Sequence, residues 1–87
     1  MNVEFFGPFD KLAEKKVHIA IEDSILLKDL LRVLAGRYPG FARYCQTGND
    51  AELSAHMTII RSGIHLKLSD MVNDNDTVSI LLPATGG

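Results

Sequence analysis

The chain has 87 residues, of which 46% are hydrophobic and 23% charged, and its formal net charge is -2. A chain of this length forms one domain with a modest core, and its slight acidity gives no electrostatic basis for binding nucleic acid or an anionic membrane. The N-terminus lacks a signal-like apolar stretch, and no run reaches the roughly 20 apolar residues that span a bilayer. The lone cysteine forms no internal disulfide. We therefore expect a cytoplasmic protein.

The first part of the chain predicts a hairpin. Residues 3–6 form a short apolar run that Gly7-Pro8 closes, and residues 16–22 alternate between β-branched and polar side chains. A period of two with β-branched residues on one side is typical of a half-buried strand. Residues 9–15 between them are polar, and we expect a loop or turn there.

The next segment predicts one amphipathic helix. Its leucines at positions 27, 30, 31 and 34 recur at three- and four-residue spacing, so they share the face that covers a sheet. Asp23-Ser24 supplies candidate capping side chains before this helix. Gly36 and Pro39-Gly40 are expected to terminate it.

The second half of the chain predicts further strands after a region that is hard to interpret. Within residues 41–55, Gly48-Asn49-Asp50 marks a turn and residues 51–55 are a candidate helical turn. Strand-like composition returns at 56–61 and, after Ser62-Gly63, at 64–66; a polar turn at 70–76 then precedes a final strand at 77–82. The order predicts an α+β domain over residues 1–82, with a mixed sheet of four to five strands packed against one main helix.

The last five residues, Pro83-Ala84-Thr85-Gly86-Gly87, predict a flexible tail over 83–87. Pro83 has no N–H and cannot extend a central strand. Five extended residues reach about 17 Å, and glycines without a Cβ fit a narrow channel. We therefore expect the tail to carry the Gly87 carboxylate into a pocket of another protein.

Ordering such a tail opposes binding by roughly 4–8 kcal/mol, so a docking surface elsewhere must offset it. If Val78, Ile80 and Leu82 face the core, Leu81 points the other way and contributes about 1.5–3 kcal/mol when a partner buries it. One of Met57, Ile59 and Ile60 is expected to enlarge this surface, and the sequence does not decide which.

Residues 74–87 resemble the C-terminal signature of MoaD, the small subunit of molybdopterin synthase. That signature is an acidic turn, a hydrophobic strand, proline, two variable residues and Gly-Gly. The chain departs from it where Leu82-Pro83 replaces the usual double proline and Leu81 replaces a frequent aromatic residue. The related thiamine sulfur carrier, ThiS, also ends in Gly-Gly. The resemblance implies a ubiquitin-like β-grasp fold, which the order of elements fits.

The resemblance also implies a mechanism. An E1-like enzyme would use ATP to adenylate Gly87, and sulfur would replace AMP to give a thiocarboxylate. Pro83, Ala84, Thr85 and Gly86, together with Leu81, would bind the partner, which in this family is the large subunit of molybdopterin synthase. The chain would be a carrier or cosubstrate and not itself an enzyme, with no bound cofactor.

Three alternatives stay open. The activated Gly87 could instead be joined to a substrate lysine, which would make the chain a ubiquitin-like protein modifier. It could also carry sulfur toward thiamine, cysteine or a tungsten-pterin. A plain interaction module with an idle tail is the third alternative, and it predicts that deleting Gly86-Gly87 changes nothing.

Other reactive side chains favour structural interpretations. Cys45 has no neighbouring cysteine or evident base, so we expect a buried small apolar residue and not a persulfide carrier. The histidines lack zinc-ligand spacing, and the acids of the 70–76 turn lack the calcium-loop pattern. We therefore predict no metal site. The residues considered were His18, His56, His65, Asp70, Asp74 and Asp76.

Overall fold

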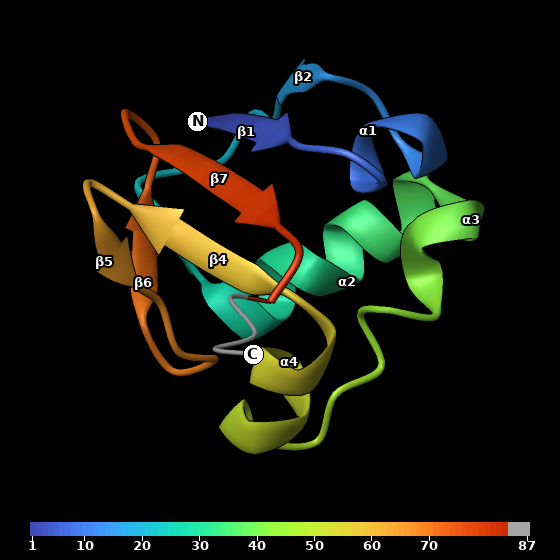
Figure 1. Ribbon diagram of the computed structural model, residues 1–87. Coiled ribbons are helices and arrows are strands. Elements are labelled where there is room, and N and C mark those ends of the chain that lie inside the picture. Colours follow the sequence, from blue (N-terminus) through green and yellow to red (C-terminus); the bar gives the residue numbers. More distant parts are fainter. Residues whose placement is uncertain (84–87) are drawn as a thin grey trace.

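A mixed five-stranded sheet is the framework of residues 1–83, the part of the chain that this computed structural model describes (Figure 1). Its strands lie in the order β2-β1-β7-β4-β5. They are β1 (Asn2–Phe5), β2 (Lys16–His18), β4 (Thr58–Arg61), β5 (Ile64–His65) and β7 (Thr77–Leu81). β1 and β7 pair in parallel at the centre, and the other neighbours are antiparallel. The predicted α+β class and the N-terminal β1–β2 hairpin are confirmed.

A second sheet of two strands corrects the prediction for the segment before the main helix. β3 (Ser24–Leu26) pairs with β6 (Met71–Asn73), so Ser24 belongs to a strand and does not cap the helix. The residue at the N-cap is Leu26, which makes no side-chain capping bond. β2 also ends at His18, earlier than predicted. The error at Ser24 arises because the β3–β6 pairing joins segments that are almost fifty residues apart.

The main helix, α2 (Leu27–Arg37), crosses one face of the five-stranded sheet (Figure 1). Its predicted apolar face is confirmed, because Leu27, Leu30, Leu31 and Leu34 are all buried. Gly36 lies inside the helix, which ends at Arg37, where the Tyr38 N–H bonds to the Leu34 carbonyl at 2.8 Å. The sheet contributes these buried residues to the same core: Val3, Phe5, Val17, Ile59, Val78 and Ile80.

Three short helices fill the connections. The predicted loop at 9–15 contains α1 (Phe9–Leu12), because buried Phe9 packs edge-on against Phe41 with ring centroids 5.6 Å apart. Pro39 was expected to terminate the main helix, but it is also the first residue of another helix, α3 (Pro39–Ala42). The candidate helical turn at 51–55 is confirmed within the longer α4 (Asp50–His56).

Candidate functional site

The predicted tail begins at the end of the central strand β7. β7 pairs with β1 on one side and with β4 on the other, and its last paired residue is Leu81, opposite Thr58. Pro83 follows two residues later and is half-buried. The roles predicted for Ala84, Thr85, Gly86 and Gly87 fall outside the described residues and stay predictions. The structure thus anchors the tail at the centre of the sheet and not at its edge.

The face of the sheet opposite α2 is open and carries apolar side chains beside this anchor. Leu81 lies there and is half-buried, on the face that the alternation predicted. Ile60 also lies there, because it pairs with Ser79. Met57 and Ile59 are 1% and 2% exposed and belong to the core. Ile60 is therefore the second apolar residue that the sequence left undecided.

Phe6 is a third apolar residue on this face, and the sequence analysis did not select it. Its N–H donates to the Ile80 carbonyl at 3.0 Å, which continues the β1–β7 pairing by one residue and places Phe6 beside Leu81. Its side chain is 44% exposed. The alternation in residues 3–6 could have found it, since Phe6 shares a face with Glu4. We name Phe6, Ile60 and Leu81 the open-face patch.

The prediction that Leu82 faces the core is wrong, because its side chain is 53% exposed. Pairing stops at Leu81, and the following Pro83 has no N–H with which to continue it. The core contribution of β7 therefore ends at Ile80. Leu82 instead adds exposed apolar surface at the point where the tail begins.

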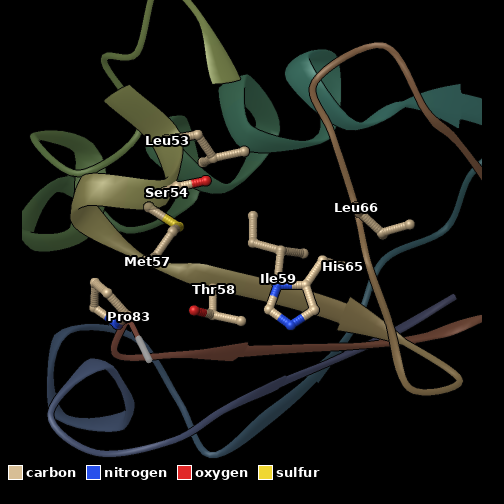
Figure 2. A pocket seen from close by; sticks show the side chains of 8 residues that line it. All are labelled: Leu53, Ser54, Met57, Thr58, Ile59, His65, Leu66 and Pro83. Atoms are coloured by element: carbon tan, nitrogen blue, oxygen red, sulfur yellow. The ribbon is translucent and has the colours of Figure 1, made fainter. Parts of the chain in front are cut away.

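A cavity of about 150 Å³ lies next to Pro83, between α4, β4 and β5 (Figure 2). Figure 2 shows Pro83 and His65 at opposite sides of it, with Thr58 between them. Its walls are formed by Leu53, Ser54, Met57, Thr58, Ile59, His65, Leu66 and Pro83. Its polar lining comes from the Ser54 and Thr58 hydroxyls and the His65 imidazole.

Cys45 behaves as the sequence analysis expected of a structural cysteine. Burial raises the pKa of its thiol to about 12, and the thiol donates to the Phe41 carbonyl at 3.7 Å. A thiol with such a pKa is neutral at physiological pH and therefore a poor nucleophile. This environment argues against a persulfide-carrying role.

The other polar side chains considered in the sequence analysis have structural roles or lie apart. Asp70 accepts from the Lys67 N–H at 2.7 Å, and Asp76 accepts from the Asn73 N–H at 2.8 Å, so both carboxylates close turns. Within residues 1–83, no cluster of three or more His, Cys, Asp or Glu side chains is placed to hold a metal ion. Over the same residues, no helix combines the length and apolarity needed to cross a bilayer.

Known proteins resemble this chain over nearly its whole length. The model of the ThiS family matches residues 3–87. Small archaeal modifier protein 3 of Haloferax volcanii is 27% identical over 92 residues, which cover 100% of this chain and 98% of that protein.

Two solved structures have the same fold. The crystal structure of SAMP1 from Haloferax volcanii superposes with a TM-score of 0.76 at 24% identity, covering 99% of this chain and 97% of the other. A candidate molybdopterin converting factor subunit 1 from Pyrococcus furiosus gives a TM-score of 0.77 at 21% identity, covering 95% of each chain. With the family match over residues 3–87, these similarities show that the chain belongs to the ThiS family and has a ubiquitin-like β-grasp fold.

Proposed function

We propose that the chain is a sulfur carrier whose Gly87 carboxylate is adenylated by an E1-like enzyme and converted to a thiocarboxylate. The observation that carries this proposal is the position of Pro83, at the end of the central strand and beside the open-face patch, four residues before Gly87. The family match, which extends to Gly87, supports it. The chain then acts as a cosubstrate, and its partners supply the catalytic groups.

The first chemical step, adenylation of Gly87, takes place on the activating enzyme. The Gly87 carboxylate attacks the α-phosphorus of ATP, pyrophosphate leaves, and a mixed anhydride with AMP forms. A sulfur nucleophile then attacks the carbonyl carbon and AMP leaves. ATP is consumed by the activating enzyme and is not a resident cofactor of this chain. Adenylation is needed because a carboxylate by itself is a poor electrophile.

The open-face patch contributes binding free energy that offsets part of the cost of ordering the tail. Ordering four tail residues costs roughly 4–8 kcal/mol. Fully burying an exposed large apolar side chain contributes about 1.5–3 kcal/mol. Because Phe6 is 44% exposed and Ile60 and Leu81 are already half-buried, each gains only a fraction of that value, and the patch offsets part of the ordering cost when a partner covers it. Its position beside Pro83 lets the same partner hold the patch and receive the tail.

For the acceptor, we propose a pterin precursor bound to the large subunit of a molybdopterin synthase. The support is the resemblance of residues 74–87 to the MoaD signature. The acidic turn of this signature precedes β7 directly, and its Asp76 side chain accepts from the Asn73 N–H at 2.8 Å.

A second candidate function is protein modification, in which a substrate lysine attacks the activated Gly87 and forms an isopeptide bond. The observation that favours it is the similarity, over the full length of this chain, to a protein named small archaeal modifier protein 3. Both functions share adenylation of Gly87 and differ in the nucleophile that follows.

Intact-mass measurement tests the proposal. The protein is incubated with ATP, an E1-like enzyme and a sulfur donor, and a chain lacking Gly87 is the control. The sulfur-carrier function predicts a mass gain equal to replacement of one oxygen by sulfur, which the control does not show. Lysine-linked conjugates without that gain would favour the modifier. Neither product, with several activating enzymes, would refute both.

A further inference from the structure

The cavity beside Pro83 lies at the point where the described part of the chain ends (Figure 2). Its volume is about 150 Å³, and Pro83 forms one of its walls. The next four residues, 84–87, therefore start at the wall of the cavity. A segment tethered in this way has a high effective concentration at the cavity, which a segment of a separate protein does not have.

The four residues after Pro83 are long enough to cross the cavity. Pro83 and His65 lie at opposite sides of it, with Thr58 between them (Figure 2). His65 pairs with Ile60, which is two residues along β4 from Thr58, a distance of about 7 Å. Four extended residues reach about 13–14 Å. Gly87 can therefore reach His65 while the residues before it lie over Thr58.

The composition of this segment, Ala84-Thr85-Gly86-Gly87, suits a cavity of this size. Its largest side chain is a threonine, and the two glycines have no Cβ, so their backbone can approach the walls closely. The floor of the cavity is apolar and accepts the alanine methyl group. It is formed by the buried side chains of Leu53, Met57, Ile59 and Leu66.

The polar groups of the cavity suit a carboxylate on one side and a peptide backbone on the other. Among the residues described, no Asp, Glu, Lys or Arg side chain lines it, so no fixed anion repels a carboxylate. His65 and Ser54 are exposed and can both donate hydrogen bonds. α4 ends at His56, and the partial negative charge of its last carbonyls disfavours a carboxylate beside Ser54. The carboxylate therefore belongs on the His65 side.

We propose that the tail of the free chain docks into this cavity. The Gly87 carboxylate accepts a hydrogen bond from the His65 imidazole, and the Ser54 hydroxyl donates to a carbonyl of the tail. Thr58 pairs with Leu81, so the docked tail lies next to the open-face patch. The inference shares with the proposed function only the free carboxylate of Gly87.

Docking of the tail would compete with its delivery to a partner. A partner that covers the open-face patch has to draw the tail out of the cavity before it can receive Gly87. Only chains with a free tail are competent for this step. The apparent affinity of the partner is therefore lowered in proportion to the fraction of chains whose tail is free.

Amide hydrogen exchange, measured by NMR on the full chain, tests the proposal. The reference is the blocked peptide acetyl-Pro-Ala-Thr-Gly-Gly, which has the same terminal carboxylate and no cavity. Gly86 and Gly87 are expected to exchange about two- to fivefold more slowly in the chain than in the peptide, because docking protects their amides. Conversely, a chain that lacks Gly86 and Gly87 is expected to show shifted amide signals at Ser54 and His65.

Matched variants locate the docking site. Ser54→Trp places a large side chain in the cavity and is expected to return the exchange of both glycine amides to the peptide rates. Ala51→Trp is its control, because Ala51 is exposed on the same helix and does not line the cavity. Helical side chains lean toward the N-terminus, so this tryptophan points away from Ser54, and protection is expected to stay.

A second pair of variants tests the hydrogen bond to the carboxylate. His65→Ala is expected to reduce the protection of both glycine amides. His18→Ala removes an exposed imidazole from β2, which does not border the cavity, and is expected to leave the protection unchanged. Retained amide dispersion shows that each variant is folded.

Three results overturn the proposal. Exchange at the peptide rate in the unchanged chain shows that the tail is not held. Protection that persists in Ser54→Trp shows that it is held elsewhere. Protection that disappears on dilution shows that the tail of a second copy occupies the cavity.

Discussion

The Arg61 guanidinium donates a hydrogen bond to the Asp76 carboxylate at 3.0 Å, and this contact ties the end of β4 to the turn before β7. The same guanidinium nitrogen donates to the Met71 carbonyl at 2.6 Å. Asp76 also accepts from the Asn73 N–H at 2.8 Å. One half-buried ion pair therefore fixes the start of the strand that ends at the tail.

Replacing Asp76 with alanine is expected to lower the free energy of unfolding by about 1–2 kcal/mol. The variant loses a charge-assisted bond and a turn bond, although partial exposure reduces the contribution of the charge. Urea denaturation measures the change. Asp74→Ala is the control, because Asp74 is exposed in the same turn and is expected to change stability by less than about 0.5 kcal/mol. Equal losses in the two variants would contradict the assignment.

The start of α4 offers a second stability prediction. Asn49 caps this helix by accepting from the Glu52 N–H at 2.9 Å. Removing an N-cap side chain costs about 1 kcal/mol, so Asn49→Ala is expected to lower the free energy of unfolding by that amount. Thermal and urea denaturation check it, and Asn75→Ala at an exposed turn position serves as the reference. If both asparagines can be replaced without loss, the cap contributes no stability.

Local patterns in the sequence predicted the elements whose side chains face the core with a regular period. The leucines of α2 and the alternation of β7 are examples, since burial alone selects such residues. The pairing of Ser24–Leu26 with Met71–Asn73 could not be predicted this way, because neither segment has a strong period and the partners are distant in sequence. The cap at Asn49, with Glu52 three residues later, was a readable signal that the analysis missed.

Some residues of the candidate site could likewise be predicted from the sequence, and others could not. Alternation placed Leu81 on the correct face because it lies within the paired strand. The same rule failed one residue later at Leu82, since alternation has no meaning after pairing stops. Phe6 joins the patch only through the parallel β1–β7 register, and a single sequence does not show which strands are neighbours.

The raised thiol pKa of Cys45 predicts slow chemical modification. At pH 8 the native chain is expected to react with iodoacetamide about a hundredfold more slowly than the urea-unfolded chain, because few native thiols are ionised. The folded pKa of about 12 exceeds the ordinary value of 9.0, so this group's contribution to stability is fully present below pH 9 and decreases as pH rises toward 12. Equally fast modification of the native chain would refute the assigned environment.

The unpartnered hydroxyl of Thr47 predicts a stabilising substitution. Thr47→Val keeps the shape of the side chain and removes a buried group without a hydrogen-bond partner, so the free energy of unfolding of the isolated chain is expected to rise by about 1 kcal/mol. Urea denaturation measures this effect, and Thr77→Val at an exposed position is the control. A destabilised variant would show that the hydroxyl already has a partner.

The open-face patch makes the most direct prediction about the proposed function. Leu81→Glu introduces a charge where a partner is expected to bury an apolar side chain. Because Leu81 is already half-buried in the free chain, the lost burial accounts for only about 1 kcal/mol. The cost of desolvating the new carboxylate in the interface brings the expected loss in kcat/KM for adenylation of Gly87 to roughly ten- to a hundredfold. The measurement is ATP–pyrophosphate exchange with an E1-like enzyme, at several concentrations of the variant.

Thr77→Glu is the matched control for this variant. Thr77 lies on the same strand and the same face as Leu81, but at the far end from the tail, opposite Asn2. The Thr77→Glu variant carries the same added charge in the same sheet. A general effect of charge or β-propensity would therefore lower kcat/KM equally in both variants. A loss confined to Leu81→Glu, with unchanged thermal stability, therefore assigns docking to the patch. Equal losses in the two variants would show that the enzyme recognises the tail without it.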